Sequence, residues 1–337
     1  MHKKTKINIA VSLMTVIVII FCALIAIFPG ESIAAAKGGL LLWFNNVLPS
    51  LLPFIIGINL LMGLGTLNGF GKLLSPIMKP LFKVSGIGGF ALAAGMMSGY
   101  PMGAKIVSSL RKDNSISKIE AQRLIGFSNN SGPLFIIGAV GVGMFGSSII
   151  GYFILTAHYL SAVISGIFHR FYKSNDASYE YTEHFKKKHQ NSDSFLTLLS
   201  DSVKNAMETI LMIGGFIILF SVISTLLQES GVIIYITELL SGAGQLVGLN
   251  KEGLSGVLTG LIEITNGTNL VAASSQNRPA FLAVTAIISF GGFSIHTQAA
   301  GFIKETDISF GQYILSKAAH AFLSVAVGIA LLPFFGL

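Results

Sequence analysis

The chain has 337 residues, of which 52% are hydrophobic and only 11% are charged, and its mean hydropathy is +0.73. Because a soluble globular domain carries about 25% charged residues, this composition excludes a soluble protein and predicts an integral membrane protein. The net charge of +7 is expected in cytoplasmic loops, and aromatic and basic residues do not alternate, so nucleic acid is not an expected partner.

The first predicted element is an N-terminal transmembrane helix within residues 1–37. Three lysines precede an apolar run from Ile7 to Phe28. An Ala-x-Ala-like site near Ala36 would suit a cleaved signal peptide, but the run is longer than the roughly 7–15 residues of a typical signal core. The helix-breaking Pro29 also separates this run from the alanines. We expect an uncleaved helix, with a cleaved signal peptide as the alternative.

Two halves of similar design follow at residues 38–170 and 194–337, joined by a polar linker at 171–193. Each half begins with a long apolar helix and continues with an amphipathic stretch. Next come a Gly-rich helix interrupted by polar residues, short apolar arms around a polar tip, and a full-length closing helix. The histidines in and beside the linker match no metal-ligand spacing, so no metal is expected at His169, His184 and His189.

Each half is predicted to contain a broken helix. The first, at 86–110, contains SGYPMGAKIV, and its counterpart contains EITNGTNLV at 263–271. An unwound turn inside a membrane is tolerated only where protein or water satisfies its backbone groups. Breaks in matching positions therefore indicate a secondary transporter built from two inverted repeats. Re-entrant hairpins are predicted at 122–149, with the tip FSNNSGPLF, and around FGGFSIHTQ at 290–298.

The distribution of basic residues predicts the orientation of the helices. We place the N-terminus, the lysines of 71–84 and the linker inside, so that the interrupted helix 86–110 crosses outward. This path leaves a second basic cluster outside, which conflicts with the positive-inside rule. The cluster consists of Arg111, Lys112, Lys118 and Arg123.

The breaks also carry ionisable side chains, Lys105 in the first half and Glu263 in the second. Placing either at bilayer depth costs about 2.5–3.5 kcal/mol on insertion scales, so each needs a partner or a cavity. They either form a buried ion pair that locks the halves together, or bind substrate, with Lys105 as the anchor for an anion and Glu263 as a coordinating carboxylate. The predicted substrate-binding set is Gly99, Tyr100, Gly103, Lys105, Asn129, Asn130, Ser131, Glu263, Asn266, Asn269, Ser294 and His296.

The stretches PSLLPFIIGINLLMGLG, SGYPMGAK and SNNSGPLFI closely resemble the YlbJ family of sporulation membrane proteins, from about residue 5 to the C-terminus. This family belongs to the Gate, or nucleoside-recognition, superfamily, which is related to concentrative nucleoside transporters. The resemblance implies a role in moving dipicolinic acid, a small aromatic dicarboxylate, across the outer forespore membrane. Lys105 would suit such a substrate by pairing with a carboxylate.

The sequence thus predicts an all-α membrane transporter of a small polar or anionic solute. It contains no P-loop, HExxH, GxSxG or dinucleotide fingerprint, so neither enzymatic activity nor a cofactor is expected. A cation-coupled nucleoside-type transporter, with an unknown coupling ion, is the first alternative, because Glu263, Asn266 and Asn269 suit ribose hydroxyls. A non-transporting sporulation scaffold is the second.

Overall fold

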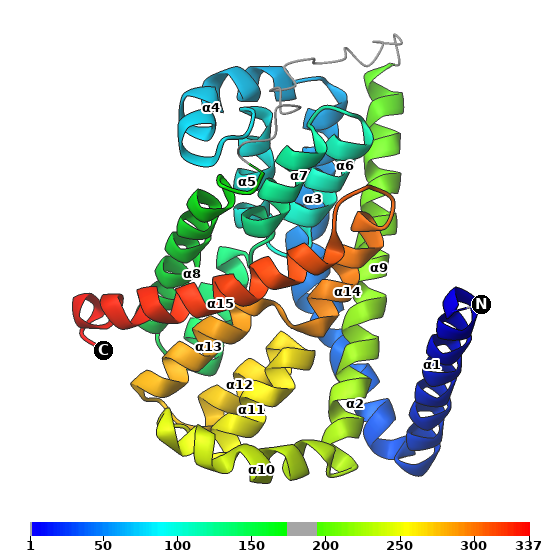
Figure 1. The fold of residues 1–337 in the computed structure, drawn as a ribbon, viewed down its shortest axis with the longest axis vertical. Helices are drawn as coiled ribbons and strands as arrows, with labels where there is room; N and C mark the ends of the chain where they lie inside the picture. The colour runs from blue at the N-terminus through cyan, green and yellow to red at the C-terminus, as the bar shows by residue number, and fades with distance from the viewer. Residues whose placement is uncertain (1, 174–193) are drawn as a thin grey trace.

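The structure of the chain is a computed structural model that describes residues 2–173 and 194–337. Nearly all of the predicted linker lies outside these residues, as do His184 and His189. The described residues form helices and connecting turns, with no strand among them (Figure 1). The first half contains α1 (His2–Ile27), α2 (Pro29–Leu42), η1 (Trp43–Val47), α3 (Leu48–Gly63), α4 (Leu67–Phe82), α5 (Ile87–Ser98), α6 (Met102–Lys112), α7 (Lys118–Ser128), η2 (Leu134–Met144) and α8 (Ser148–His169). The second contains α9 (Phe195–Glu229), α10 (Val232–Leu246), α11 (Lys251–Ile262), α12 (Ile264–Ser274), α13 (Arg278–Phe290), α14 (Gly292–Ile303), α15 (Phe310–Leu331) and η3 (Leu332–Phe335).

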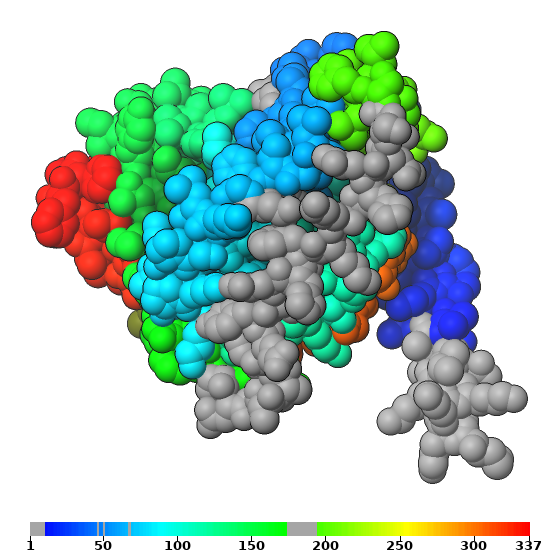
Figure 2. Space-filling view, turned by 90° about the horizontal axis from the view of Figure 1, so that it is seen from above, coloured from blue at the N-terminus to red at the C-terminus, as the bar shows by residue number. Residues whose placement is uncertain are grey.

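Several helices are long and apolar enough to cross a membrane. Within the described residues there are 4 such spans: α8, α9, α13 with α14, and α15 with η3. There are up to 7 if each sharply bent pair counts as one span, namely α1 with α2 (102°), α4 with α5 (88°) and α10 with α11 (112°). The helix α1 lies at the edge of the molecule, in contact with α2 and α9 (Figures 1 and 2), and exposes apolar side chains such as Leu13 and Ile17.

Polar residues in the connecting turns determine where many of these helices begin. Ser117 and Glu120 form a capping box at the start of α7, each side chain accepting a backbone N–H from the other residue. Glu120 also accepts the N–H of Ser85, 2.7 Å away, which fixes α7 to the turn between α4 and α5. Single side-chain caps start five other helices, at Ser147, Ser194, Asn250, Asn277 and Ser309.

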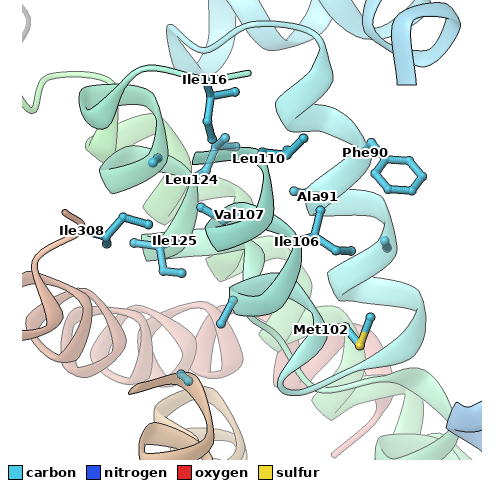
Figure 3. Packing of buried hydrophobic residues seen from close by; sticks show 14 of the residues in the cluster. Phe90, Ala91, Met102, Ile106, Val107, Leu110, Ile116, Leu124, Ile125 and Ile308 are labelled. Atoms are coloured by element: carbon cyan, nitrogen blue, oxygen red, sulfur yellow. The ribbon is translucent and has the colours of Figure 1, made fainter. Parts of the chain in front are cut away.

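The predicted outward crossing at 86–110 is wrong, because α5 and α6 form a hairpin. Gly99 has φ +86°, in the left-handed region, and Pro101 lacks a backbone N–H, so the helix ends between them. The arms then pack so closely that a methyl group built at Gly95 would lie 3.1 Å from Cα of Gly103. Figure 3 shows the two arms side by side, with Phe90 and Ile106 on opposite arms.

The helices α11 and α12 form a second hairpin around Glu263. A methyl group built at Gly267 would lie only 2.1 Å from Cα of Gly260, so the two arms touch through their backbones. Gly103 and Gly267 thus both lie where one arm of a hairpin meets the other.

The predicted re-entrant arms at 122–149 are also wrong, because α7 and η2 together form a broken crossing that runs antiparallel to α8. At one end, the Nε and Nη2 atoms of Arg123 donate to the carbonyl oxygen of Tyr172, just beyond α8. At the other end, a methyl group built at Gly141 would lie 2.6 Å from Cα of Gly151, near the start of α8. The 22 residues of α8 correspond to about 33 Å, enough to span a bilayer.

The segment 290–298 is likewise a break in a crossing rather than a hairpin tip. The residues Arg278–Ile303 form one span of 26 residues, and Gly291, with φ +97°, marks the break between α13 and α14. The structure therefore exchanges the two predicted roles. The segments expected to cross are hairpins, and those expected to be re-entrant cross the molecule.

This exchange also corrects the predicted orientation. Arg123 donates to the carbonyl oxygens of Lys83 and Tyr172, so the turn between α6 and α7 lies at the same end as the turn after α4 and the end of α8. The basic cluster of 111–123 was predicted to lie opposite these groups. Because the α5–α6 hairpin returns to the end from which it started, the cluster joins the other basic residues, as the positive-inside rule requires.

Two apolar clusters hold the hairpins and the broken crossings in place. The first lies among α5, α6 and α7 and is seen in Figure 3. Its fully or almost fully buried members include Ala91, Ile106, Val107, Leu110, Leu124 and Ile125. The second lies among η2, α8 and α13 and includes Val140, Phe153, Ile154, Val284 and Ile288.

Candidate functional site

The tip of the first hairpin packs against the break between α7 and η2. A methyl group built at Gly99 would lie 2.7 Å from the backbone nitrogen of Gly132, and one built at Gly103 would lie 2.1 Å from the carbonyl oxygen of Ser128. Both predicted glycines therefore lie where two backbones approach closely. Any side chain at either position would separate the hairpin from the break.

Asn129 ties this break to two other elements. Its Oδ1 atom accepts the N–H of Ala104 in α6 at 3.3 Å, and its Nδ2 atom donates to the hydroxyl of Tyr313 in α15 at 2.9 Å. The next two residues, Asn130 and Ser131, are also buried. Asn130 donates from Nδ2 to the carbonyl oxygen of Phe127, 2.7 Å away, while its Oδ1 has no partner.

Tyr100 connects the tip of the first hairpin to the second broken crossing, α13 and α14. Its hydroxyl donates to the carbonyl oxygen of Ile288, 2.9 Å away, near the end of α13. Its ring lies against the backbone of Gly291, where a methyl group would be 3.5 Å from the ring carbon Cζ. The tip of the first hairpin and the break of the second crossing therefore meet.

Tyr313 links the two breaks. Its hydroxyl accepts from Asn129, so its own proton points to Nδ1 of His296 on α14, 3.3 Å away. This assignment places the other ring proton of His296 on Nε2, which is buried and has no partner. Two residues along, Gln298 is also buried, and its Oε1 has no partner. Ser294 is its neighbour one turn earlier and accepts from its Nε2 at 3.4 Å.

Glu263 caps its own hairpin. Its two carboxylate oxygens accept the N–H groups of Thr265 and Asn266, at 3.0 and 2.8 Å, at the start of α12. Asn266 is only partly buried, and Asn269 is exposed on α12. The structure therefore brings Glu263 to the hairpin tip but does not gather Asn266 and Asn269 with it as buried polar groups.

The predicted ion pair between Lys105 and Glu263 does not form. Lys105 lies on α6, and its Nζ atom donates to the hydroxyl of Thr209 on α9, 2.8 Å away. The carboxylate of Glu208, also on α9, is close enough to interact with its charge. The two ionisable groups thus belong to different contacts, and neither locks the halves together.

Sequence reasoning expected His158 and His320 to pack within the closing helices but missed Lys317, which joins them in a buried basic cluster on α8 and α15. Lys317 and His320 of α15 and His158 of α8 are all fully buried. The rings of His158 and His320 stack with centroids 4.9 Å apart, and His158 accepts the N–H of Ser131 at its Nε2 atom. The available signal was the spacing of Lys317 and His320, three residues apart on one face of an otherwise apolar helix.

The described residues hold no group of three or more His, Cys, Asp or Glu side chains that would bind a metal ion. What converges instead is two hairpin tips, two helix breaks and several buried polar atoms without a partner. The buried atoms without a partner on these elements include Ser128 Oγ and Asn130 Oδ1 at the first break, His296 Nε2 and Gln298 Oε1 on α14, and Thr268 Oγ1 on α12. In a membrane such groups are expected only where they line a binding site or a cavity.

Comparison with known proteins places this arrangement in a family. A family model described as Gate, nucleoside recognition, matches residues 44–148, which include the first hairpin and the first break. The sporulation integral membrane protein YlbJ of Bacillus subtilis (strain 168) is 39% identical over 313 residues, covering 86% of this chain and 74% of that protein. No solved structure matches the chain. Because this similarity extends over both halves, with their hairpins and breaks, the chain belongs to the YlbJ family of sporulation integral membrane proteins.

Proposed function

We propose that this protein is a secondary transporter of a small anionic solute, and that it is not an enzyme. The observation that carries the proposal is the meeting of two helical hairpins with two broken crossings around buried, unpartnered polar atoms. Broken helices at the interface of two repeats are the binding-site architecture of secondary transporters.

The order and direction of the helices support two inverted repeats. The series α4, α5–α6, α7–η2 and α8 has the same order as α10, α11–α12, α13–α14 and α15. The helix α7 begins at the end of the molecule where α14 finishes, because Arg111, beside the turn that leads into α7, pairs with Asp307, beyond α14. The two broken crossings therefore run in opposite directions. Figure 1 agrees, with α4 and α10 at opposite ends of the molecule.

The charges at these elements favour an anion over a neutral solute. The carboxylate of Glu263 already accepts two backbone N–H groups at the N-terminus of α12. The ammonium of Lys105 has three N–H donors, of which one hydrogen bond goes to the neutral hydroxyl of Thr209. The carboxylate of Glu208 also interacts with this charge, but the remaining donors and the partly exposed side chain still make Lys105 the group to which we propose that a substrate carboxylate binds.

Within this class, dipicolinic acid is the solute we propose, and the outer forespore membrane is the location. The support is the family resemblance together with Lys105. The alternative is a nucleoside, because the family model that matches residues 44–148 is described as nucleoside recognition. We favour dipicolinate because Asn269 is exposed and the carboxylate of Glu263 caps its own helix, so two of the three groups expected to bind ribose hydroxyls are not free buried acceptors.

Uptake into liposomes that carry the purified full-length protein tests this proposal. We expect saturable uptake of dipicolinate that a nucleoside does not inhibit. Lys105→Ala should abolish uptake, while Lys304→Ala, at an exposed lysine, should leave it unchanged. Saturable nucleoside flux without dipicolinate uptake would establish the alternative. No flux of either compound, from protein that unfolds cooperatively, would favour the scaffold.

A further inference from the structure

Lys317 is the most completely enclosed lysine among the described residues. Its side chain is fully buried on α15, within the bundle. The Nζ atom donates to the carbonyl oxygen of Asn129 at 2.9 Å and lies 3.1 Å from Nδ1 of His320. It also lies over the ring of Tyr100, 5.2 Å from the centroid, within the range of a cation–π contact.

The carbonyl that Lys317 contacts belongs to the C-terminal end of a helix. The helix α7 ends at Ser128, and Asn129 is its C-cap residue. The last carbonyls of a helix lack intrahelical partners and carry the negative end of the helix dipole, so they attract cations. In transporters with broken helices, such ends coordinate the coupling ion.

The neighbouring carbonyls at the same break have neutral partners. The carbonyl oxygen of Phe127 accepts from the side-chain amide of Asn130. The carbonyl oxygen of Ser131 accepts from the hydroxyl of Tyr159 at 3.2 Å. The positive charge at this helix end therefore comes from Lys317, and it is supplied by the protein itself.

The hydrogen-bond network assigns the protons around Lys317. His320 accepts at Nδ1 from the ammonium, so its proton is on Nε2 and points to the carbonyl oxygen of His158, 3.0 Å away. His158 accepts at Nε2 from the N–H of Ser131, so its proton is on Nδ1 and points to the hydroxyl of Ser289, 2.8 Å away. With the ammonium of Lys317 as the donor to His320, both imidazoles are neutral and the network carries a single charge.

All the donor directions of this ammonium are in use. One N–H goes to a carbonyl, one goes to an imidazole, and the remaining side faces an aromatic ring. No N–H is left for a substrate carboxylate, which distinguishes Lys317 from Lys105. The ammonium itself occupies the position beside the carbonyl of Asn129 in which a free cation would bind.

We propose that the ammonium of Lys317 is a tethered cation that fills the position of a free sodium ion at the break between α7 and η2, so that this protein works without sodium. The contribution of Lys317 to transport rests on the proposed function. The occupation of an ion position by Lys317 is independent of that function, because cation binding can be measured in the absence of any solute.

Thermal unfolding of the purified full-length protein in detergent tests the ion position directly. The midpoint is measured in sodium chloride and in choline chloride at equal ionic strength. The variants are Lys317→Ala, which opens space at the carbonyl, and Lys317→Met, which removes the charge but keeps most of the volume. Lys304→Ala, at an exposed lysine, is the matched control.

We expect the wild type and Lys304→Ala to have the same midpoint in both salts. Both Lys317 variants should unfold roughly 5 °C or more below the wild type in choline, because a buried carbonyl loses its charged donor. Sodium should raise the midpoint of Lys317→Ala in a saturable way, since a ligand that binds only the folded state stabilises it. Lys317→Met, whose methyl group fills the space, should not respond to sodium.

Three results would overturn the proposal. The first is a saturable sodium effect on the wild type. The second is a wild-type midpoint for both Lys317 variants in choline. The third is a Lys317→Ala variant that folds, unfolds at the lower midpoint and ignores sodium. If Lys317→Ala does not fold, the wild type and Lys317→Met decide the question. A saturable sodium effect on either of them, or a wild-type midpoint for Lys317→Met in choline, would refute the tethered cation. Uptake measured in sodium-free and in sodium-containing buffer is the companion measurement. Uptake that requires sodium would refute the tethered cation, whereas no uptake in either buffer would refute the proposed function instead.

Discussion

Substituting Gly267 by alanine should force the second hairpin apart. The new methyl group would lie 2.1 Å from Cα and 2.2 Å from the nitrogen of Gly260. Non-bonded carbons pack at about 3.5–4.0 Å, so the arms must separate by about 1.5 Å. Overpacking usually costs about 1–3 kcal/mol, and the upper end applies because the obstacle is backbone and cannot rotate away. Alanine recovers about 1 kcal/mol through its higher helix propensity, which leaves a net loss of about 2 kcal/mol.

The assay is thermal unfolding of the purified protein in detergent. At about 2–4 °C per kcal/mol, Gly267→Ala should lower the midpoint by about 5 °C. Gly215→Ala is the matched control, because Gly215 is an exposed helical glycine with no atom within 4 Å of an added methyl group. We expect this control to unfold at or slightly above the wild-type midpoint. Equal midpoints for the two variants would refute the close packing of α11 against α12.

Three further predictions concern contacts at the end of the first hairpin and at its tip. The hydrogen bond from Arg111 holds the pKa of Asp307 below its usual value, so the stabilisation from this pair is present at neutral pH and is lost as the pH falls through the pKa of the folded carboxylate. Asp307→Asn should therefore weaken the pH dependence of the unfolding midpoint between roughly pH 5 and pH 3, measured by thermal unfolding at a series of pH values. Glu120→Ala leaves the N–H groups of Ser85 and of Ser117, the N-cap residue of α7, without an acceptor, and should lower the free energy of unfolding by about 2–3 kcal/mol in chemical denaturation. Tyr100→Phe removes the donor to a buried carbonyl of α13 and should cost about 1–2 kcal/mol in the same measurement, whereas an unchanged value would show that the hairpin tip does not bind there.

The positions of the breaks could be predicted from the sequence, but the path of the chain after each break could not. Gly99 and Pro101 mark the end of a helix through local conformational preferences, which any sequence displays. Whether the next helix continues or returns depends on Gly95 facing Gly103. Eight positions separate these glycines along the chain, and that spacing has a meaning only once the chain has reversed.

The candidate site was predictable in the same uneven way. Lys105 attracts attention because it follows a Gly- and Pro-rich break, and the structure places it beside α9. Lys317 lies in an unbroken helix, and nothing around it in the sequence separates it from a lysine that reaches toward the membrane surface. Its environment is created by Asn129, which is 188 positions away, and such a contact has no local signature.

The conflict between the basic residues and the predicted orientation carried structural information. A path with an outward crossing at 86–110 places Arg111 and Arg123 on the side that the positive-inside rule disfavours. Replacing that crossing by a hairpin moves the whole cluster to the other end in a single step. There Arg123 binds the carbonyl oxygens of Lys83 and Tyr172, and Arg111 pairs with Asp307. A violated charge rule beside a Gly- and Pro-containing break therefore argues that the broken segment returns, and the amino-acid sequence by itself supplies this physical reason to prefer a re-entrant hairpin.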